Sequence, residues 1–119
     1  MKESQALEAF AALSQQTRLS VLRLLIKAGE QGVPAGAIAE ELAVSASNIS
    51  FHLKELERAG LIRQRREARS IIYAADYSGL RDLIQFLMMD CCAGRPEITG
   101  PIIERAACGP AQPATRRRS

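Results

Sequence analysis

SASNISFHLKELERAGLIRQRREARSIIY, residues 45–73, contains the two patterns that decide the fold of this chain. Its first half predicts a helix that Ser45 caps and that Gly60 ends. The apolar positions of this helix follow the i, i+4, i+7 spacing of one narrow stripe: Ile49, Leu53 and Leu56. We expect that stripe to face the interior of the protein.

The opposite side of this helix is polar except for one aromatic residue. At about 100° per residue, that side carries Ser47, Ser50, Phe51, Lys54 and Arg58. A large aromatic side chain on an otherwise polar face is unexpected if water is its only neighbour. A solvated polar face explains each residue taken singly, but the group together favours contact with a partner.

The second half of the stretch predicts two short strands around a charged turn near Glu67 and Ala68. Ile62 on the first strand and Ile71–Tyr73 on the second favour strand over helix. Four arginines lie within seven residues of this hairpin: Arg63, Arg65, Arg66 and Arg69. Such clustered positive charge is favourable beside the phosphates of a nucleic acid.

Three helices are predicted before this stretch, at residues 4–13, 16–28 and 35–42. The first helix is expected to be capped by Ser4 and to face inward with Leu7, Phe10, Ala11 and Leu13. The inward residues of the second are expected to be Leu19, Leu22, Leu25 and Ile26, and those of the third Ile38, Ala39 and Leu42. A short turn, AVSA, joins the third helix to the fourth. Helix, short turn, polar-faced helix and hairpin form a winged helix-turn-helix, an α+β fold that is mainly α and enters the DNA major groove.

A last helix is predicted from Ser78 to Cys91, with Leu80, Leu83, Ile84, Leu87 and Met88 on its apolar side. The Pro-, Gly- and Ala-rich remainder contains one expected helical turn at IIERAA. We therefore assign residues 1–92 to one DNA-binding and dimerisation domain. Residues 93–119 form a flexible tail that carries Cys108 and a basic end.

Composition limits the class of protein. The 119 residues, 47% hydrophobic and 24% charged with a net charge of +3, suit one ordinary globular domain. Neither a membrane-spanning run nor a signal peptide is present, so we expect a cytoplasmic protein without a membrane partner. Three cysteines are an odd number, and cytoplasmic thiols stay reduced. A structural disulfide framework is therefore not expected.

Two segments of the chain resemble parts of the ArsR (ArsR/SmtB) family of metalloregulatory repressors. The segment TRLSVLRLL, residues 17–25, resembles the second helix of that family, and residues 45–73 resemble its recognition helix and wing. The resemblance covers residues 5–94. It implies a homodimer, joined through its first and last helices, that binds a double-stranded operator palindrome when free of metal and releases it on binding metal.

The polar face and the wing supply the predicted DNA contacts. The short side chains suit base edges or phosphates, the cations on the helix suit phosphates, and the wing suits the backbone or the minor groove. These residues are Ser45, Ser47, Asn48, Ser50, Phe51, Lys54, Arg58, Arg66 and Arg69. His52 is expected to be half-buried and hydrogen-bonded rather than a metal ligand. Glu55 is the only potential ligand within one helical turn of it, and one carboxylate does not make a metal site.

The cysteines decide which metal site of the family this chain resembles. The third-helix arsenic site is absent, because residues 41–45 contain no thiol. The zinc site of the final helix lacks histidine, although Asp76 and Asp82 are present. CCAGRPE resembles a subgroup whose arsenite site is a cysteine pair at the end of the last helix. A third cysteine usually follows closely there, whereas here the next thiol is Cys108.

The predicted site is therefore Cys91, Cys92 and Cys108. Thiophilic ions prefer thiolates, and trivalent arsenic takes three sulfurs, so we expect arsenite as inducer, with antimonite as a related ion, and no resident cofactor. Two alternatives keep the fold: a methylarsenite sensor using only Cys91 and Cys92, or a thiol-redox sensor with Cys108 as resolving cysteine. An enzyme such as a thiol-based arsenate reductase is disfavoured, since no phosphate-binding glycine loop or thiol-activating histidine lies nearby.

Overall fold

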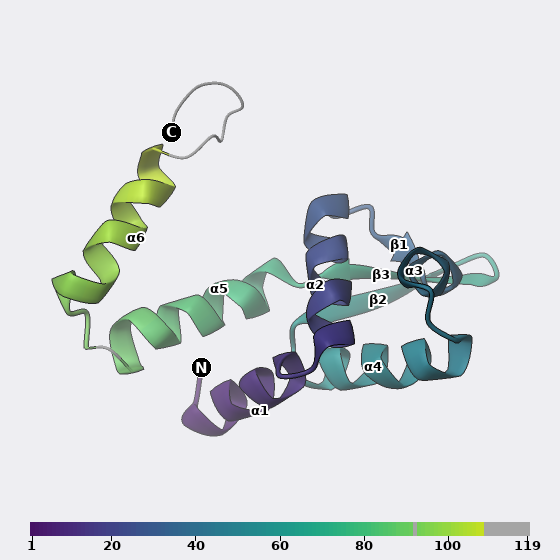
Figure 1. Ribbon diagram of the computed structural model, residues 1–119, viewed down its shortest axis with the longest axis horizontal. Helices are drawn as coiled ribbons and strands as arrows, with labels where there is room; N and C mark the ends of the chain where they lie inside the picture. The colour runs from purple at the N-terminus through teal and green to yellow at the C-terminus, as the bar shows by residue number, and fades with distance from the viewer. Residues whose placement is uncertain (92, 109–119) are drawn as a thin grey trace. The chain divides into compact units, whose positions relative to one another are not determined.

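The computed structural model describes residues 1–91 and 93–108, except for the side chains of Cys91 and of residues 106–108. The chain forms two compact units, Met1–Leu83 and Ile84–Ser119. The first contains four helices, a small sheet and most of the fifth helix, and the second contains the end and continuation of the fifth helix and a sixth (Figure 1).

The first unit confirms the winged helix-turn-helix. Its helices are α1 (Glu3–Leu13), α2 (Gln16–Ala28), α3 (Ala35–Leu42) and α4 (Ala46–Arg58), and its strands are β1 (Val33–Pro34), β2 (Ile62–Glu67) and β3 (Ser70–Ala75). The sheet order is β1-β3-β2, with both pairs antiparallel. The sequence predicted only the β2–β3 hairpin. Two residues, one of them proline, are too few to show the alternation of a strand.

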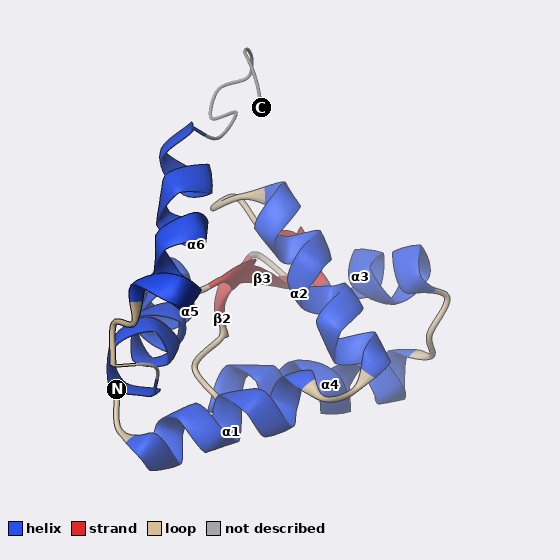
Figure 2. Cartoon of the chain, turned by 60° about the vertical axis from the view of Figure 1, so that its left-hand side comes forward, coloured by secondary structure: helices blue, strands red, loops and turns tan. Residues whose placement is uncertain are grey.

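The core of this unit lies between α2, α3, α4 and the sheet, as Figure 2 shows. The stripe of α4 is fully buried, as predicted. It packs with side chains from all the surrounding elements, the largest being Val21, Leu25, Ile38, Leu61 and Ile62. Each such side chain contributes about 1.5–3 kcal/mol on burial, so the position of α4 is fixed by its inner face alone.

The inner face of α1 differs from the prediction. Its buried residues are alanines, Ala6, Ala9 and Ala12, whereas Leu7 is 61% exposed and Phe10 is 37% exposed. Small side chains let α1 approach α2 and α4 closely, which leaves the larger apolar residues on a separate face. The helix also begins one residue earlier than predicted, with Lys2 rather than Ser4 at the cap position.

The stripe of α2 is likewise rotated from the predicted one. Val21, Leu22 and Leu25 are buried, while Leu19 is 44% and Ile26 is 43% exposed. Helical spacing alone allows either stripe, and the packing of α2 against α3 and β3 selects this one. By contrast, α3 has the predicted bounds and buries Ile38 and Ala39 as expected.

The fifth helix, α5 (Tyr77–Gln85), begins against the end of α4. Asp76 caps it, because its Oδ1 accepts hydrogen bonds from the Ser78 hydroxyl at 3.0 Å and from the Gly79 amide at 3.1 Å. A Cβ on Gly79 would collide with the backbone carbonyl oxygen of Gly60. Glycine is therefore required where α5 leaves the winged unit.

The second unit corrects two predictions. After Gln85 the chain continues as a π-helix, η1 (Phe86–Cys91), so the single α-helix predicted from Ser78 to Cys91 ends early and its α-helical spacing does not hold after Gln85. The expected flexible tail instead contains α6 (Pro96–Cys108), because one apolar turn at IIERAA extends backward to a proline that suits a helix start. The domain boundary after residue 92 stays a prediction.

None of the helices in the described residues is long and apolar enough to cross a membrane.

Candidate nucleic-acid interface

The start of α4 is fixed by its own sequence. Ser45 Oγ accepts a hydrogen bond from the Asn48 amide at 3.3 Å, the cap that the sequence predicted. The turn before it contains Ala43 in the left-handed conformation, with φ 55°, and the Ala43 amide closes α3 through the carbonyls of Ala39 and Glu40. These local bonds set the angle between α3 and α4.

The outward face of α4 gathers the predicted contact residues on one exposed surface. Phe51 is 55% exposed, although it is the largest side chain on this face. The other members are also exposed: Ser45, Ser47, Asn48, Ser50, Lys54 and Arg58. Burial of the opposite stripe leaves these side chains free of the core, so this face can lie in a groove of a partner.

Arg58, at the end of α4, forms an ion pair with Glu55 at 3.1 Å. The arginine side chain is 62% exposed. An exposed pair of this kind contributes little to stability. Arg58 can therefore exchange the carboxylate for a phosphate at small cost.

The wing divides its side chains between two faces. Gln64 donates to both carboxylate oxygens of Glu57 on α4, at 2.9 and 3.1 Å. Because alternate residues of a strand share a face, Arg66 lies on the same side of β2 as Gln64. Arg69 follows Ala68, which has φ 55°, in the turn of the hairpin. Both arginines are exposed.

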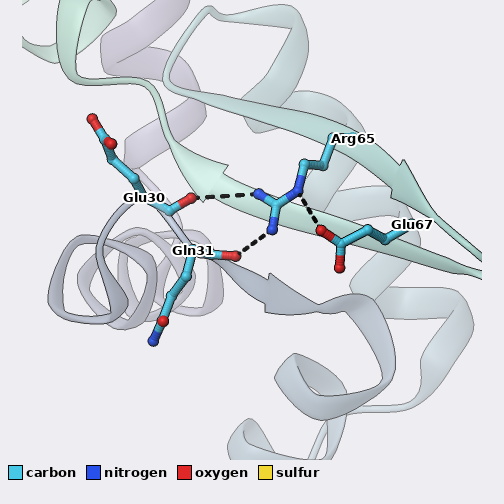
Figure 3. A network of polar contacts seen from close by, with 4 residues as sticks. All are labelled: Glu30, Gln31, Arg65 and Glu67. Atoms are coloured by element: carbon cyan, nitrogen blue, oxygen red, sulfur yellow. Dashed lines mark hydrogen bonds and ion pairs between the residues drawn. The ribbon is translucent and has the colours of Figure 1, made fainter.

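Arg65, on the other face of β2, is used within the protein (Figure 3). Its Nη2 donates to the carbonyl of Gln31 at 2.8 Å, and its Nη1 to the carbonyl of Glu30 at 3.4 Å. Its Nε pairs with Glu67 at 3.2 Å. The guanidinium thus ties the wing to the turn after α2. The sequence suggested that all four wing arginines suit the DNA backbone, and Arg65 departs from that because its donors already have partners.

His52 is half-buried and hydrogen-bonded, as predicted. Its partner is Arg18 from the first turn of α2, whose Nε donates to His52 Nδ1 at 3.1 Å. The same guanidinium lies over the ring of Phe51, 5.5 Å from its centroid. Burial, and secondarily the charge of Arg18, hold the pKa of His52 below its usual value of 6.5. The imidazole is therefore neutral at neutral pH.

Known proteins share both the sequence and the fold of this region. A family model described as a helix-turn-helix domain matches residues 13–65. Transcriptional repressor SdpR of Bacillus subtilis is 37% identical over 66% of this chain and 84% of its own length. An ArsR-like transcriptional regulator from Rhodococcus sp. RHA1 superposes with a TM-score of 0.67 and is 28% identical, over 87% of this chain and 93% of that one.

The chain belongs to the ArsR family of helix-turn-helix transcriptional regulators. HlyU from Vibrio cholerae is also similar, with 26% identity and a TM-score of 0.60 over 77% of this chain and 99% of that structure. These relatives are transcriptional regulators rather than enzymes, in agreement with the expectation from the sequence.

For this ArsR-family chain, Arg65→Met is expected to lower the free energy of unfolding by about 1 kcal/mol, because two main-chain carbonyls lose their donors. The effect is small because the side chain is 44% exposed. Urea unfolding at fixed protein concentration measures it. Arg63→Met, on the same face of the same strand, is the control and should change stability by less than half as much. Equal losses would contradict the assignment of Arg65 to the fold.

The predicted thiol site of this ArsR-family chain lies outside the described side chains. The backbone of Cys91 ends η1 and that of Cys108 ends α6, while Cys92 is not among the described residues. Among the described residues, no group of three potential metal ligands lies together. Asp76, considered with Asp82 for a zinc site, caps α5 instead.

Arg18 is the residue that sequence analysis missed. It lies inside the segment that carries the family resemblance, but helical spacing gave it no particular role. A half-buried histidine in α4 needs a hydrogen-bond partner, and a donor from elsewhere in the chain can supply it. Only the tertiary contact between α2 and α4 identifies that donor as Arg18.

Proposed function

We propose that this regulator is a homodimeric repressor, acting in the cytoplasm, that binds operator DNA and releases it when trivalent arsenic binds its cysteines. The observation that carries the DNA part is the exposed face of α4, whose inner stripe is buried while Phe51 and its polar neighbours are not. This is the arrangement by which a helix-turn-helix reads a major groove.

The contacts divide by chemistry. Ser47, Asn48 and Ser50, near the start of α4, are short donors and acceptors that reach base edges or phosphates. Phe51 is suited to apolar contact with a thymine methyl or a sugar. Lys54 and Arg58 follow on the same face and suit phosphates. Arg66 and Arg69 on the wing suit the adjacent backbone.

Dimerisation is supported by an apolar face of α1. Leu7 and Phe10 are spaced i, i+3 and exposed, while the alanine side of the helix is buried. Ile84 of α5 and Leu87 of η1 are exposed as well. Each of these helices therefore has apolar side chains available for a second copy, and two recognition helices in one dimer match the symmetry of a palindrome.

Arsenic sensing rests on the cysteine inventory. Three thiols, with one histidine engaged by Arg18, suit a thiophilic ion better than zinc. A solved structure described as "Possible transcriptional regulator for arsenical resistance" is 31% identical over 67% of this chain and 80% of that chain, with a TM-score of 0.59. That description supports the proposed inducer class.

A thiol-redox signal is the second candidate. A structure described as reduced HlyU from Vibrio cholerae is 26% identical, with a TM-score of 0.56, and that description supports this second candidate. In this chain, Cys91 or Cys92 would be oxidised by a peroxide to a sulfenic acid with release of water or alcohol. Cys108 would then displace water to form a disulfide.

Arg66→Ala and Arg69→Ala are each expected to lower the slope of log affinity against log salt concentration by about 1 and to weaken binding to all duplexes similarly. Both side chains are exposed on the wing, so their loss removes a phosphate contact rather than a base contact. Fluorescence anisotropy at several salt concentrations measures the slope. Arg65→Met is the control and should leave it unchanged. A change of sequence preference with an unchanged slope would contradict the phosphate assignment.

The proposed function as a whole is tested on a labelled duplex enriched from random sequence by the parent protein. Anisotropy titrations with arsenite, antimonite, methylarsenite, zinc, cadmium and peroxide should show release by the trivalent arsenicals and not by zinc. Release by peroxide alone would favour the redox candidate. Failure to enrich any duplex would overturn the DNA-binding proposal itself.

A further inference from the structure

Three side chains meet at the side of α4 that faces outward, and one of them comes from a different helix. Arg18 belongs to the first turn of α2, where its amide is held by the Gln15 side chain at 2.9 Å. Its guanidinium contacts both His52 and Phe51. The Phe51 and His52 rings meet edge to face, with centroids 5.6 Å apart and planes at 62°. We call Arg18, Phe51 and His52 the α2–α4 clamp.

The clamp requires one protonation state. Arginine only donates hydrogen bonds, so His52 Nδ1 must be an unprotonated acceptor and the ring hydrogen must lie on Nε2. If Nδ1 takes up a proton, it becomes a second donor facing the Arg18 Nε–H, and two cations then lie side by side. The hydrogen bond between α2 and α4 is lost in that state.

We propose that Arg18 is a positioning residue that holds Phe51 in its DNA-facing orientation through neutral His52, so that protonation of His52 weakens operator binding. The inference rests on the proposed function of α4. Phe51 is exposed, so the core does not fix its side chain, and the guanidinium over its ring together with the His52 edge restrains it. A preset side chain loses less conformational freedom when DNA binds.

The charged surroundings of the clamp come from three helices. A cavity beside Arg18 is lined by Glu8 of α1 and by Glu55 and Arg58 of α4. Glu55 is paired with Arg58, and the charge that acts on His52 is that of Arg18. Since burial and Arg18 both lower the pKa of His52, the clamp is intact above the unperturbed value of 6.5 and opens as the pH falls through the lower folded-state value.

The expected sign separates the clamp from simple electrostatics. A proton added to a histidine beside DNA adds positive charge, which by itself raises affinity as the pH falls. The clamp predicts the opposite, because Arg18 and Phe51 lose their positions at the same time. Operator affinity at constant ionic strength is therefore expected to fall as the pH is lowered below the unperturbed value of 6.5, and the fall reaches about tenfold once His52 is fully protonated, because one charge-assisted hydrogen bond is lost.

The experiment compares four full-length proteins on the duplex that the parent enriches. Arg18→Met should bind about tenfold more weakly than the parent at about pH 8 and show no further fall at low pH. His52→Asn places an amide oxygen near the position of Nδ1. This variant should therefore keep most of the operator affinity of the parent but lose the pH response. Arg23→Met removes an exposed arginine from the same helix and is the matched control for charge. It should keep the fall of the parent.

A readout without DNA checks the clamp directly. The ¹⁵N resonances of the parent imidazole should show Nδ1 as the unprotonated nitrogen at about pH 8, and the Phe51 ring resonances should shift in Arg18→Met but not in Arg23→Met. Circular dichroism at each pH confirms that the variants are folded.

The outcomes distinguish this inference from the proposed function. Affinity that rises as the pH falls, or equal behaviour of Arg18→Met and Arg23→Met, overturns the clamp while leaving DNA binding in place. If the parent enriches no duplex at any pH, the proposed function fails and the clamp fails with it.

Discussion

A chain carrying both Leu7→Glu and Phe10→Glu is expected to be monomeric and to bind the enriched operator duplex at least about 100-fold more weakly than the parent. Both side chains are exposed on one face of α1, and neither belongs to the core of the first unit. The substitutions should therefore leave the fold intact. Analytical ultracentrifugation and anisotropy measure the two effects on the same samples.

The size of the effect follows from linkage between the two half-sites. Burying a leucine or phenylalanine at an interface contributes about 1.5–3 kcal/mol, and a buried unpaired carboxylate costs more. In a symmetric dimer each change occurs twice, so four apolar contacts are lost from one interface and four carboxylates are placed in it. A monomer also loses the advantage of two linked binding modules, which is about 10²–10⁴ in affinity.

Gln5→Glu is the matched control, because it adds a carboxylate to an exposed residue on another side of α1 and still accepts the hydrogen bond from Lys2. It should remain dimeric. A dimeric Leu7→Glu, Phe10→Glu protein with unchanged affinity would show that the subunits meet elsewhere.

The second large effect is expected for Cys91→Ser, which should need at least about 30-fold more arsenite for half-release of the operator, because a hydroxyl is a poor ligand for a thiophilic ion. Affinity for the duplex without arsenite should stay within about twofold of the parent, since the cysteine lies outside the DNA-binding elements. Anisotropy under reducing conditions measures both. An unchanged arsenite midpoint would exclude Cys91 from the site.

Cys108→Ser separates the three-thiol site from the two-thiol site. It should raise the arsenite concentration needed for release but leave release by methylarsenite unchanged, because methylarsenite binds two sulfurs. A parallel loss of both responses would make Cys108 a ligand for either arsenical. If neither response changes, the site consists of Cys91 and Cys92 alone.

The helix α6 bears on how Cys108 takes part. A helix of 13 residues is about 20 Å long, and Cys108 is its last residue, while Cys91 precedes its first. An intact α6 therefore places Cys108 at the end of the helix away from Cys91, so a contact within one chain requires the segment between η1 and α6 to turn back along the helix. A contact with the other subunit does not require that turn. We therefore favour a contribution of Cys108 across the dimer.

Much of the helix-turn-helix could be predicted because its signals are local. Ser45 caps its own helix, Gly60 ends it, and Ile49, Leu53 and Leu56 show their common face at helical spacing. The exposed polar face follows from that stripe without further information. The hairpin was predictable for the same reason, since β2 and β3 are adjacent in sequence and joined by a short turn.

The alanine side of α1 shows where the same reasoning failed. Spacing identified Leu7 and Phe10 as apolar and helical, but it assumed that the larger residues face the core. The close packing of α1 against α2 and α4 requires small side chains, which reversed that assignment. Hydrophobic spacing locates the apolar faces of a helix. It does not say which of two faces packs against the core of its own chain and which is exposed.

The sequence by itself determined the order of the first four helices, the bounds of α3, the start of α4 and the polar character of its outer face, because each depends on residues within a few turns of one another. The tertiary structure decided the third strand β1, the engagement of Arg65 with Glu30 and Gln31, and the pairing of Arg18 with His52. Those contacts join residues more than 30 positions apart, so the local spacing of residues in the sequence cannot predict them. The wing arginines look alike in sequence, and only the face on which each lies distinguishes a structural one from those proposed to contact DNA.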